Sequence, residues 1–349
     1  MRRKVGIIGH FGGGQHYCDG QTVKTQELAM LLEQTGQFDI KRVDTYFNKC
    51  NKMKLAIDVL LCLFTCKDVF LLVADKGMNF FLPFLYYFSK GKRINVYHYI
   101  IGSEILSMVQ QNPRLVKYLN SFAVNWFEYE SGTCVLKKKG VLNADTLPNM
   151  KLITPVDQPE VYPTDEKQYR FCTFSRVIPE KGIPEAIHAI REINAENGKS
   201  IARLDIYGPV DAGFESEFMD MVNANRAFVT YKGVAESHQS VMILKNYYAV
   251  LFPTRWLGEG MAGTIIDAFA AGVPVIASDW NANGELITNG SNGVIYPSEN
   301  LKSLKNAVVW AMKNPEKMNQ MRTACRESFE RYKPEAILTT ILSEMQRHG

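Results

Sequence analysis

Short apolar runs alternate with amphipathic segments through most of the chain. Four runs in its first part have the length and composition of strands, at 4–9, 38–44, 68–74 and 94–101. The segment 21–36 repeats its apolar residues at helical spacing instead, with Leu28, Leu31 and Leu32 on one face. Such alternation predicts an open parallel sheet with helices on both faces.

The pattern changes near residue 151, because 151–168 contains three prolines and several charges and is typical of a linker. Strand and helix patterns then start again, at 169–177, 182–197, 202–209, 228–234, 239–247 and 248–256. From 301 onward the pattern is helical. We therefore predict two doubly wound α/β domains, 1–154 and 155–331, with a C-terminal helix at about 332–349 that crosses back to the first domain.

The composition is that of a globular protein, since 46% of the 349 residues are hydrophobic and 22% are charged. A net charge of +4 is too small to indicate nucleic-acid binding. The cysteines form no Cys-x-x-Cys pair with companion histidines, so we expect no metal and reduced thiols in the cytoplasm. No run reaches the roughly 18 apolar residues of a spanning helix, and the first run is too short for a signal peptide.

The segment 258–278, GEGMAGTIIDAFAAGVPVIAS, combines a turn, a helix and a strand. Glu259 and Asp267 flank a turn of small residues whose backbone amides can approach a ligand closely. The turn leads into a helix N-terminus, which favours phosphate, and an acid one turn later can hold hydroxyl groups. The alternative is a plain helix in which Glu259 complements the dipole and Asp267 is merely exposed.

Arg176 and Lys181 follow a predicted strand and precede a predicted helix, in FSRVIPEKG at 174–182. Ligands bind at the carboxyl ends of strands in open α/β sheets, and two fixed cations there suit a diphosphate. Two solvated surface cations are the alternative interpretation.

The glycine-rich loop after the first strand does not match a dinucleotide fingerprint, because Tyr17 stands where the third glycine would follow Gly12 and Gly14. The loop still suits close backbone approach to a ligand, with Asp19 or Thr22 as the cap of the next helix. A plain strand–helix connection is the alternative.

His98 ends a buried-looking strand, and we weigh a catalytic role for it against a packed position in the core. The sequence contains neither the GxSxG motif of serine hydrolases nor the GxxxxGK[ST] motif of a P-loop.

Together these segments resemble the retaining glycosyltransferases of sequence family 4, bacterial polysaccharide-biosynthesis type. Those enzymes have the GT-B fold, in which two Rossmann-like domains face a cleft. The resemblance covers most of the chain and rests on FSRVIPEKGIPEAIHAI (174–190), YKGVAES (231–237) and the long segment 252–297. In the last of these, two acids separated by seven residues bracket the donor, which is a highly specific match.

The resemblance also implies a role for each motif. Glu259 would face the donor sugar, Asp267 would hold the ribose hydroxyls, and Arg176 with Lys181 would neutralise the departing phosphate. The other donor-binding positions that it implies are Gly260, Met261, Ala262, Gly263, Thr264, Val234, Gly14 and Gly20.

Three positions depart from the family pattern. Asp267 replaces the usual glutamate, so the ribose contact becomes single, water-bridged or shifted. Asp19 replaces a glycine, and Lys24 stands where a histidine is common. We assign Asp19 and Lys24 to the acceptor side, with a merely solvated Lys24 as the alternative.

We accordingly expect a retaining glycosyltransferase that needs no metal and no cofactor. It would move a sugar from a nucleotide-diphosphate sugar, with a UDP-sugar favoured, to a glycan or lipid-linked acceptor. The alternatives are a nucleotide-sugar epimerase, a non-catalytic nucleotide-sugar-binding protein and an NAD oxidoreductase.

The segment MNFFLPFLYYFSKGKR, at 78–93, bears on location because it crowds aromatic residues directly before Lys90, Lys92 and Arg93. Such a combination is typical of an interfacial segment, here at the inner face of an anionic membrane. The alternative is a core helix with a basic end. A core helix would bury nearly all of the aromatics, whereas an interfacial helix would leave several exposed.

Overall fold

The computed structural model describes residues 2–14, 20–91, 94–163, 168–298 and 300–349. The chain divides into two compact units. Unit 1 consists of Met1–Lys151 and Tyr332–Gly349, and unit 2 is Leu152–Arg331. The sequence pattern predicts the corresponding boundaries after residues 154 and 331.

Unit 1 contains a parallel sheet of six strands in the order β2-β1-β3-β4-β5-β6. The strands are β1 (Arg3–Gly9), β2 (Phe38–Asp44), β3 (Asp68–Leu72), β4 (Asn95–Tyr99), β5 (Val124–Phe127) and β6 (Ala144–Thr146). Every residue of β3 is buried, as expected for a central strand with helices on both faces.

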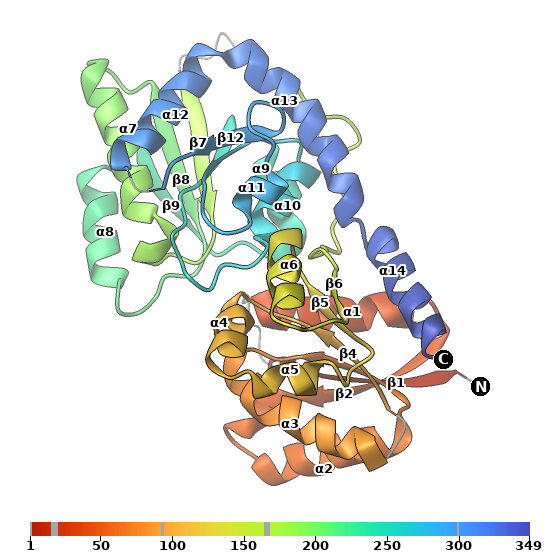
Figure 1. The fold of residues 1–349 in the computed structure, drawn as a ribbon. Helices are drawn as coiled ribbons and strands as arrows, with labels where there is room; N and C mark the ends of the chain where they lie inside the picture. Colours follow the sequence, from red (N-terminus) through yellow and green to blue (C-terminus); the bar gives the residue numbers. More distant parts are fainter. Residues whose placement is uncertain (1, 15–19, 92–93, 164–167, 299) are drawn as a thin grey trace. The chain divides into compact units, whose positions relative to one another are not determined.

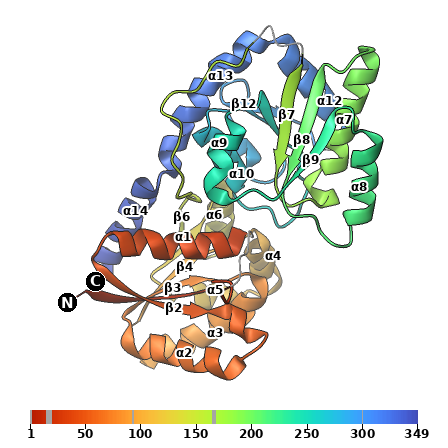
Figure 2. The same ribbon diagram turned by 180° about the vertical axis from the view of Figure 1, so that it is seen from behind.

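Helices cover both faces of this sheet, and α1 lies opposite α2 and α3 in both views (Figures 1 and 2). The helices of unit 1 are α1 (Gly20–Gln34), η1 (Thr45–Asn48), α2 (Lys52–Thr65), α3 (Asp75–Gly91), α4 (Glu104–Gln111), α5 (Arg114–Leu119), α6 (Glu130–Lys138) and α14 (Pro334–Arg347). The last helix packs beside α1, and the carbonyl of His348 accepts a hydrogen bond from Asn95 Nδ2 at 2.8 Å. The C-terminal segment is thereby attached to the sheet of unit 1.

Unit 2 repeats the architecture with a second six-stranded parallel sheet, in the order β12-β11-β10-β7-β8-β9. The strands are β7 (Tyr169–Phe174), β8 (Ala202–Tyr207), β9 (Val229–Gly233), β10 (Ala249–Phe252), β11 (Val275–Ser278) and β12 (Gly293–Tyr296). The helices are η2 (Pro179–Lys181), α7 (Ile183–Glu196), α8 (Glu215–Ala224), η3 (Ser237–Gln239), α9 (Ser240–Leu244), α10 (Gly263–Ala270), α11 (Asn283–Leu286), α12 (Leu301–Lys313), α13 (Pro315–Ser328) and η4 (Phe329–Tyr332). Helix α7 packs beside α12, and α10 packs against both α9 and α13.

Local sequence explains several helix ends. The side chain of Asn51 accepts a hydrogen bond from the Lys54 amide at 3.0 Å and so caps α2. Helices α13 and α14 begin at Pro315 and Pro334, a position where the missing N–H of proline is not needed. Helix α1 is followed by Gly36 at a φ of 68°, which ends it.

The strand orders fix where each sheet can bind a ligand. In unit 2 the chain runs from β7 outward to β9, then returns to place β10 on the other side of β7. The corresponding reversal in unit 1 lies between β1 and β3. Loops after neighbouring strands diverge at such a reversal and leave room for a ligand at the carboxyl ends. The predicted pair of doubly wound α/β domains is therefore confirmed.

Among the described residues, no helix combines the length and the hydropathy that crossing a bilayer requires.

Candidate functional site

The loops that follow β7 and β10 meet at the strand-order reversal of unit 2. The amide of Arg255, after β10, donates a 2.7 Å hydrogen bond to the carbonyl of Glu180, after β7. The guanidinium of Arg255 also forms an ion pair with Glu185 in the first turn of α7. Gly182 lies at a φ of 73°, and a Cβ there would come within 2.2 Å of the Pro253 carbonyl oxygen. The two loops therefore form one closely packed segment pair.

Lys181 and Glu259 form a buried ion pair at this meeting point. Lys181 Nζ lies 2.5 Å from Glu259 Oε2, and the hydroxyl of Thr254 donates to the same oxygen at 2.8 Å. All three side chains are buried. Asn281, which follows β11, donates its side-chain amide to the backbone carbonyl of Glu259 at 3.0 Å. Three neighbouring strands of unit 2 thus contribute to holding Glu259 in place.

Arg176 and Lys181 share an aromatic neighbour, Trp256. The Arg176 guanidinium lies 5.0 Å from the centroid of the Trp256 ring, and Lys181 Nζ lies 4.9 Å from it. Cations at this distance are attracted by the ring quadrupole. The indole N–H of Trp280 donates to the Trp256 carbonyl at 2.8 Å. Arg176 is exposed while Lys181 is buried, so one side of the cation pair is accessible to a ligand.

The predicted turn and helix start lie at the same edge. Helix α10 begins at Gly263, and its N-cap residue Ala262 has no side chain that could bind the first amides. The hydroxyl of Thr264 donates to the carbonyl of Phe174, the last residue of β7, at 2.5 Å. This bond attaches the helix start to the strand that precedes Arg176. First-turn amides and two cations are consequently held at one strand reversal, which is suitable for binding an anion.

The other predicted donor positions differ in their burial and in their place in the sheet. Asp267 lies in the second turn of α10 and is buried, so the interpretation of Asp267 as an exposed side chain is wrong. Met261 is buried in the turn, whereas Gly260 is half-buried. Val234 is exposed and follows β9, which is two strands away from β7 at the edge of the sheet.

The glycine loop of unit 1 is closed by Asp44 at the end of β2. Asp44 Oδ1 accepts from the Phe11 amide at 2.9 Å, and Oδ2 accepts from the Gly13 amide at 2.7 Å. Gly14 has a φ of 83°, and Gly20 is the exposed first residue of α1. Asp19 lies outside the described residues. The carboxylate that would meet a ribose in a dinucleotide-binding fold is here bound to backbone amides.

Lys24 is buried rather than solvated. Its ammonium forms an ion pair with Glu128, which directly follows β5, and lies 4.5 Å from the centroid of the Tyr99 ring. Burial lowers the pKa of Lys24 to about 7, although the nearby Glu27 carboxylate opposes that shift. The interpretation of Lys24 as a solvated side chain is therefore wrong. The structure places a buried charge pair at the carboxyl edge of the unit 1 sheet.

His98 occupies a fully buried position near the end of β4. Its Nδ1 lies 3.0 Å from Asn125 Oδ1, and its ring makes an edge contact with Phe122 at a centroid distance of 6.0 Å. Burial lowers the pKa of His98 to about 4, because the charged imidazolium is poorly solvated there. These surroundings favour the packed core position over the catalytic role.

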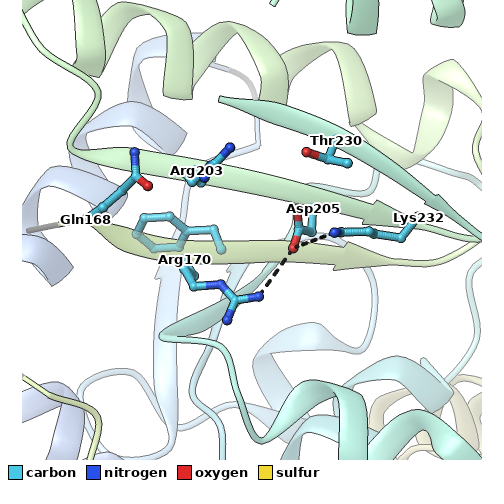
Figure 3. Close-up of a pocket in the computed structure, with 7 residues that line it drawn as sticks. Gln168, Arg170, Arg203, Asp205, Thr230 and Lys232 are labelled. Carbon is cyan, nitrogen blue, oxygen red and sulfur yellow. Dashed lines mark ion pairs between the residues drawn. The ribbon is translucent and has the colours of Figure 1, made fainter. Parts of the chain in front are cut away.

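A separate cavity of about 350 Å³ lies over β7, β8 and β9 (Figure 3). It is lined by Gln168, Arg170, Phe171, Arg203, Asp205, Thr230 and Lys232. Asp205 Oδ2 lies 3.6 Å from Arg170 and 3.9 Å from Lys232. Arg170, Arg203 and Thr230 are each the second residue of their strand, so the cavity lies toward the opposite edge from Glu259. It contains none of the residues that the sequence singled out.

Several residues of these sites were missed by the sequence interpretation. Thr254, Trp256 and Asn281 all lie within the long segment 252–297 but received no role. Their position was the available signal, since side chains at the carboxyl edge of the sheet can reach a ligand. Thr254 and Trp256 lie at the end of the predicted segment 248–256, and Asn281 comes shortly after the strand that ends at Ser278. Glu128, which follows β5, and Asp44, the last residue of β2, were likewise missed.

Comparisons with known proteins show which families and folds this chain is similar to. Residues 157–328 match the family model of glycosyl transferases group 1. An uncharacterized glycosyltransferase of Methanocaldococcus jannaschii is 26% identical over 153 residues, which are 44% of this chain and 41% of that protein. The lipopolysaccharide core biosynthesis mannosyltransferase LpsB of Rhizobium meliloti is 44% identical over 57 residues, or 16% of each chain. The matched segments thus span less than half the length of these curated relatives.

Solved structures match over nearly the whole chain. Anabaena HepE in complex with UDP and glucose superposes with a TM-score of 0.73 and 15% identity, covering 99% of this chain and 100% of that one. The sucrose-phosphate synthase of Thermosynechococcus elongatus gives a TM-score of 0.79 with 14% identity and 99% of each chain covered. The chain therefore has the GT-B fold, and its residues 157–328, nearly all of unit 2, are similar to the glycosyl transferases group 1 family.

Proposed function

We propose that this protein is a retaining, metal-independent glycosyltransferase of sequence family 4. It transfers a sugar from a nucleotide-diphosphate sugar, with a UDP-sugar favoured, to a glycan or lipid-linked acceptor in cell-surface polysaccharide synthesis. The observation that carries the proposal is the convergence of Arg176, Lys181, Glu259 and the start of α10 at one strand reversal of a group 1 domain. The UDP present in the HepE complex supports the choice of donor.

In this proposal the diphosphate lies against the first-turn amides of α10, with Arg176 and Lys181 beside it. Both cations are positioned before the ligand binds, because Trp256 lies next to each of them. Fixed charges of this kind stabilise negative charge that develops on a leaving group and are among the largest catalytic terms. Asp267, one helical turn further on, holds the ribose hydroxyls.

Glu259 faces the donor sugar, and its ion pair with Lys181 links the sugar side of the site to the phosphate side. The bond between the anomeric carbon and the β-phosphate oxygen breaks, and the bond to the acceptor oxygen forms on the same face of the sugar. The acceptor hydroxyl proton passes to the departing phosphate oxygen. The anomeric configuration is therefore retained, and no side-chain nucleophile is required.

We also propose that the protein works in the cytoplasm, with its acceptor presented at the inner face of the membrane. A bilayer surface is where a lipid-linked sugar would be met. Lys24 and Glu128, the buried pair at the carboxyl edge of unit 1, lie on the side of that unit's sheet where a ligand would bind. We assign the acceptor to unit 1 on this basis.

A panel of nucleotide sugars tests the donor half of this proposal. A bound donor raises the melting temperature by mass action, so a UDP-sugar should give the largest shift. Arg176→Ala should abolish the shift. Arg191→Ala, which removes an exposed arginine bonded to His188 on α7, is the matched control and should keep it.

Product analysis with the stabilising donor then separates the activities. Transfer with retention, unchanged by a chelator, supports the proposal. A new sugar formed from the donor alone would identify an epimerase, and binding without turnover on any acceptor would identify a nucleotide-sugar-binding protein. Nicotinamide binding in place of nucleotide-sugar binding would overturn the proposal altogether.

A further inference from the structure

Helix α2 exposes a stripe of large apolar side chains. Met53, Ile57, Leu60, Leu61 and Phe64 are between 42% and 75% exposed. Their spacings of four, three, one and three residues place them on one face of the helix. Single exposed apolar residues need no explanation on a protein surface, but a continuous stripe does.

The inner face of the same helix already supplies the contacts to the core. Val59, Cys62 and Leu63 are buried, and α2 packs against β1 and β2. A surface helix of this kind is ordinarily polar on its outer face. Packing within unit 1 therefore does not account for the outer stripe.

Helix α3 continues the apolar surface. Phe80 and Tyr87 are 61% and 65% exposed, while Phe84 and Phe88 are half-buried. The rings of Phe80, Phe84 and Phe88 follow one another at centroid distances of 5.7 and 6.0 Å, and Phe88 meets Phe64 of α2 at 5.8 Å.

We call this surface the apolar ridge, and it consists of Met53, Ile57, Leu60, Leu61, Phe64, Phe80, Phe84, Tyr87 and Phe88. Its two helices lie side by side on one face of the unit 1 sheet in both views (Figures 1 and 2). Of the eight aromatic and leucine residues from Phe80 to Phe88, four are buried and four are exposed or half-buried. This division is the one expected of an interfacial helix and not of a helix packed wholly in a core.

Basic residues surround the ridge in the sequence. Residues 49–93 contain eight Lys and Arg against three Asp, a net charge of +5, while the whole chain carries +4. Asp68 is fully buried and bound to Arg3, and Asp58 is bound to Lys54. Lys49, Lys52 and Lys76 are exposed, so their charges face the solvent, and Lys52 directly precedes Met53 of the ridge.

We propose that the apolar ridge is a membrane-docking surface that inserts among the headgroups of an anionic bilayer. Exposed aromatic and aliphatic side chains beside lysines are the features of a helix that lies in the plane of an interface. A second copy of the chain fits less well, because a two-fold contact would bring two segments of charge +5 together. The inference rests on the proposed function only for its biological reason, which is access to a lipid-linked acceptor.

Sedimentation of the full chain with vesicles tests the inference. The protein should bind vesicles of phosphatidylcholine mixed with phosphatidylglycerol at low salt, and binding should weaken at high salt and on pure phosphatidylcholine. Leu60→Gln/Phe64→Gln, at two exposed positions, should reduce the partition coefficient at least about tenfold, as loss of two large apolar contacts would. Leu142→Gln, at an 80% exposed leucine elsewhere in unit 1, is the matched control and should bind normally.

Two further readouts make the result decisive. The docking variant should keep its melting temperature and its response to a UDP-sugar, so loss of vesicle binding is not a folding effect. Failure of the wild type to sediment at low salt overturns the inference, as does equal binding by the docking variant. A dimer that the variant dissociates would assign the ridge to a second copy instead. Vesicle binding without any response to nucleotide sugars would retain the inference and overturn the proposed function.

Discussion

Lys181 Nζ lies 2.5 Å from Glu259 Oε2, and this ion pair joins the loop after β7 to the loop after β10. The two residues are 78 positions apart in the sequence, and both side chains are buried. Thr254 donates to the same carboxylate oxygen at 2.8 Å. Because the pair spans the strand reversal of unit 2, it contributes both to the shape of the candidate site and to its charge.

We expect the two partners to be strongly coupled in stability. Removal of one member of a buried pair leaves the other charge uncompensated and lowers the free energy of unfolding by about 3 kcal/mol. Lys181→Met and Glu259→Gln should each lower the melting temperature in calorimetry. In the double variant the decrease in melting temperature should be smaller than the sum of the two single decreases. Additive losses in the double variant would show that the two side chains act independently.

Glu259 and Asp267 should affect different steps. Glu259→Gln should cut turnover while UDP binding stays nearly normal, because Glu259 faces the sugar in the proposed function. Asp267→Ala should weaken UDP binding instead. Calorimetric titration with UDP and steady-state kinetics distinguish the two, and the reverse pattern would exchange the roles. Tighter donor binding by Asp267→Glu would show that the site accommodates the longer acid.

Loss of Arg176 should reduce turnover more than loss of the Trp256 ring beside it. Arg176→Ala should reduce turnover on the order of 100-fold or more, since it removes a charge that stabilises the leaving group. Trp256→Leu keeps the cation and loses only the ring contact, so turnover should fall roughly five- to tenfold. Steady-state rates under saturating donor provide the measurement. Equal losses in both variants would mean that Trp256 has a role of its own in donor binding.

Much of the fold could be predicted because it depends on local patterns. The apolar run 68–74 contains the buried strand β3, Asp68–Leu72, and the helical spacing of Leu28, Leu31 and Leu32 correctly predicts that they are buried. Arg176 and Lys181 could be chosen because the carboxyl end of a strand is a position that the sequence alone identifies.

Partners across the sheet could not be predicted, because they depend on strand order. Lys24 and Glu128 are 104 positions apart, and nothing in either local sequence indicates that they form a buried pair. Charged residues are rarely buried unless they are paired. With no partner visible in the local sequence, the charge of Lys24 favours a contact with a ligand or a solvated position. Asp44 and the glycine loop meet for a similar reason, since β1 and β2 are neighbours in the sheet.

Gly182 should be required for the contact between the two loops of the site. Gly182→Ala would strain a φ of 73° and place a Cβ within 2.2 Å of the Pro253 carbonyl oxygen, so the loop after β10 must shift. Gly198→Ala is the matched control, because Gly198 has a φ of 62° with no atom within 4 Å of its Cβ position. Gly182→Ala should show the larger fall in melting temperature and weaker UDP binding. Similar effects of both substitutions would mean that backbone strain alone matters and that the contact with Pro253 does not.

His98 should make the stability of the protein depend on pH in mildly acidic solution. Burial lowers the pKa of His98 from 6.5 to about 4, so between these values the unfolded chain binds a proton that the folded chain does not. Stability from this residue is therefore complete above pH 6.5 and is lost as the pH falls toward 4. The full loss is about 3 kcal/mol, since each pKa unit corresponds to about 1.4 kcal/mol.

Other groups titrate in the same range, so the measurement is the difference in melting temperature between the wild type and His98→Gln across pH 4 to 8. Gln keeps a polar group that can reach Asn125, and it does not titrate. The melting temperature of the wild type should therefore fall relative to that of the variant as the pH falls. His238→Gln, at an exposed histidine of unit 2, controls for the exchange of a histidine for glutamine itself. A difference for His98→Gln that stays flat across this range would mean that His98 is as accessible to protons in the folded chain as in the unfolded one.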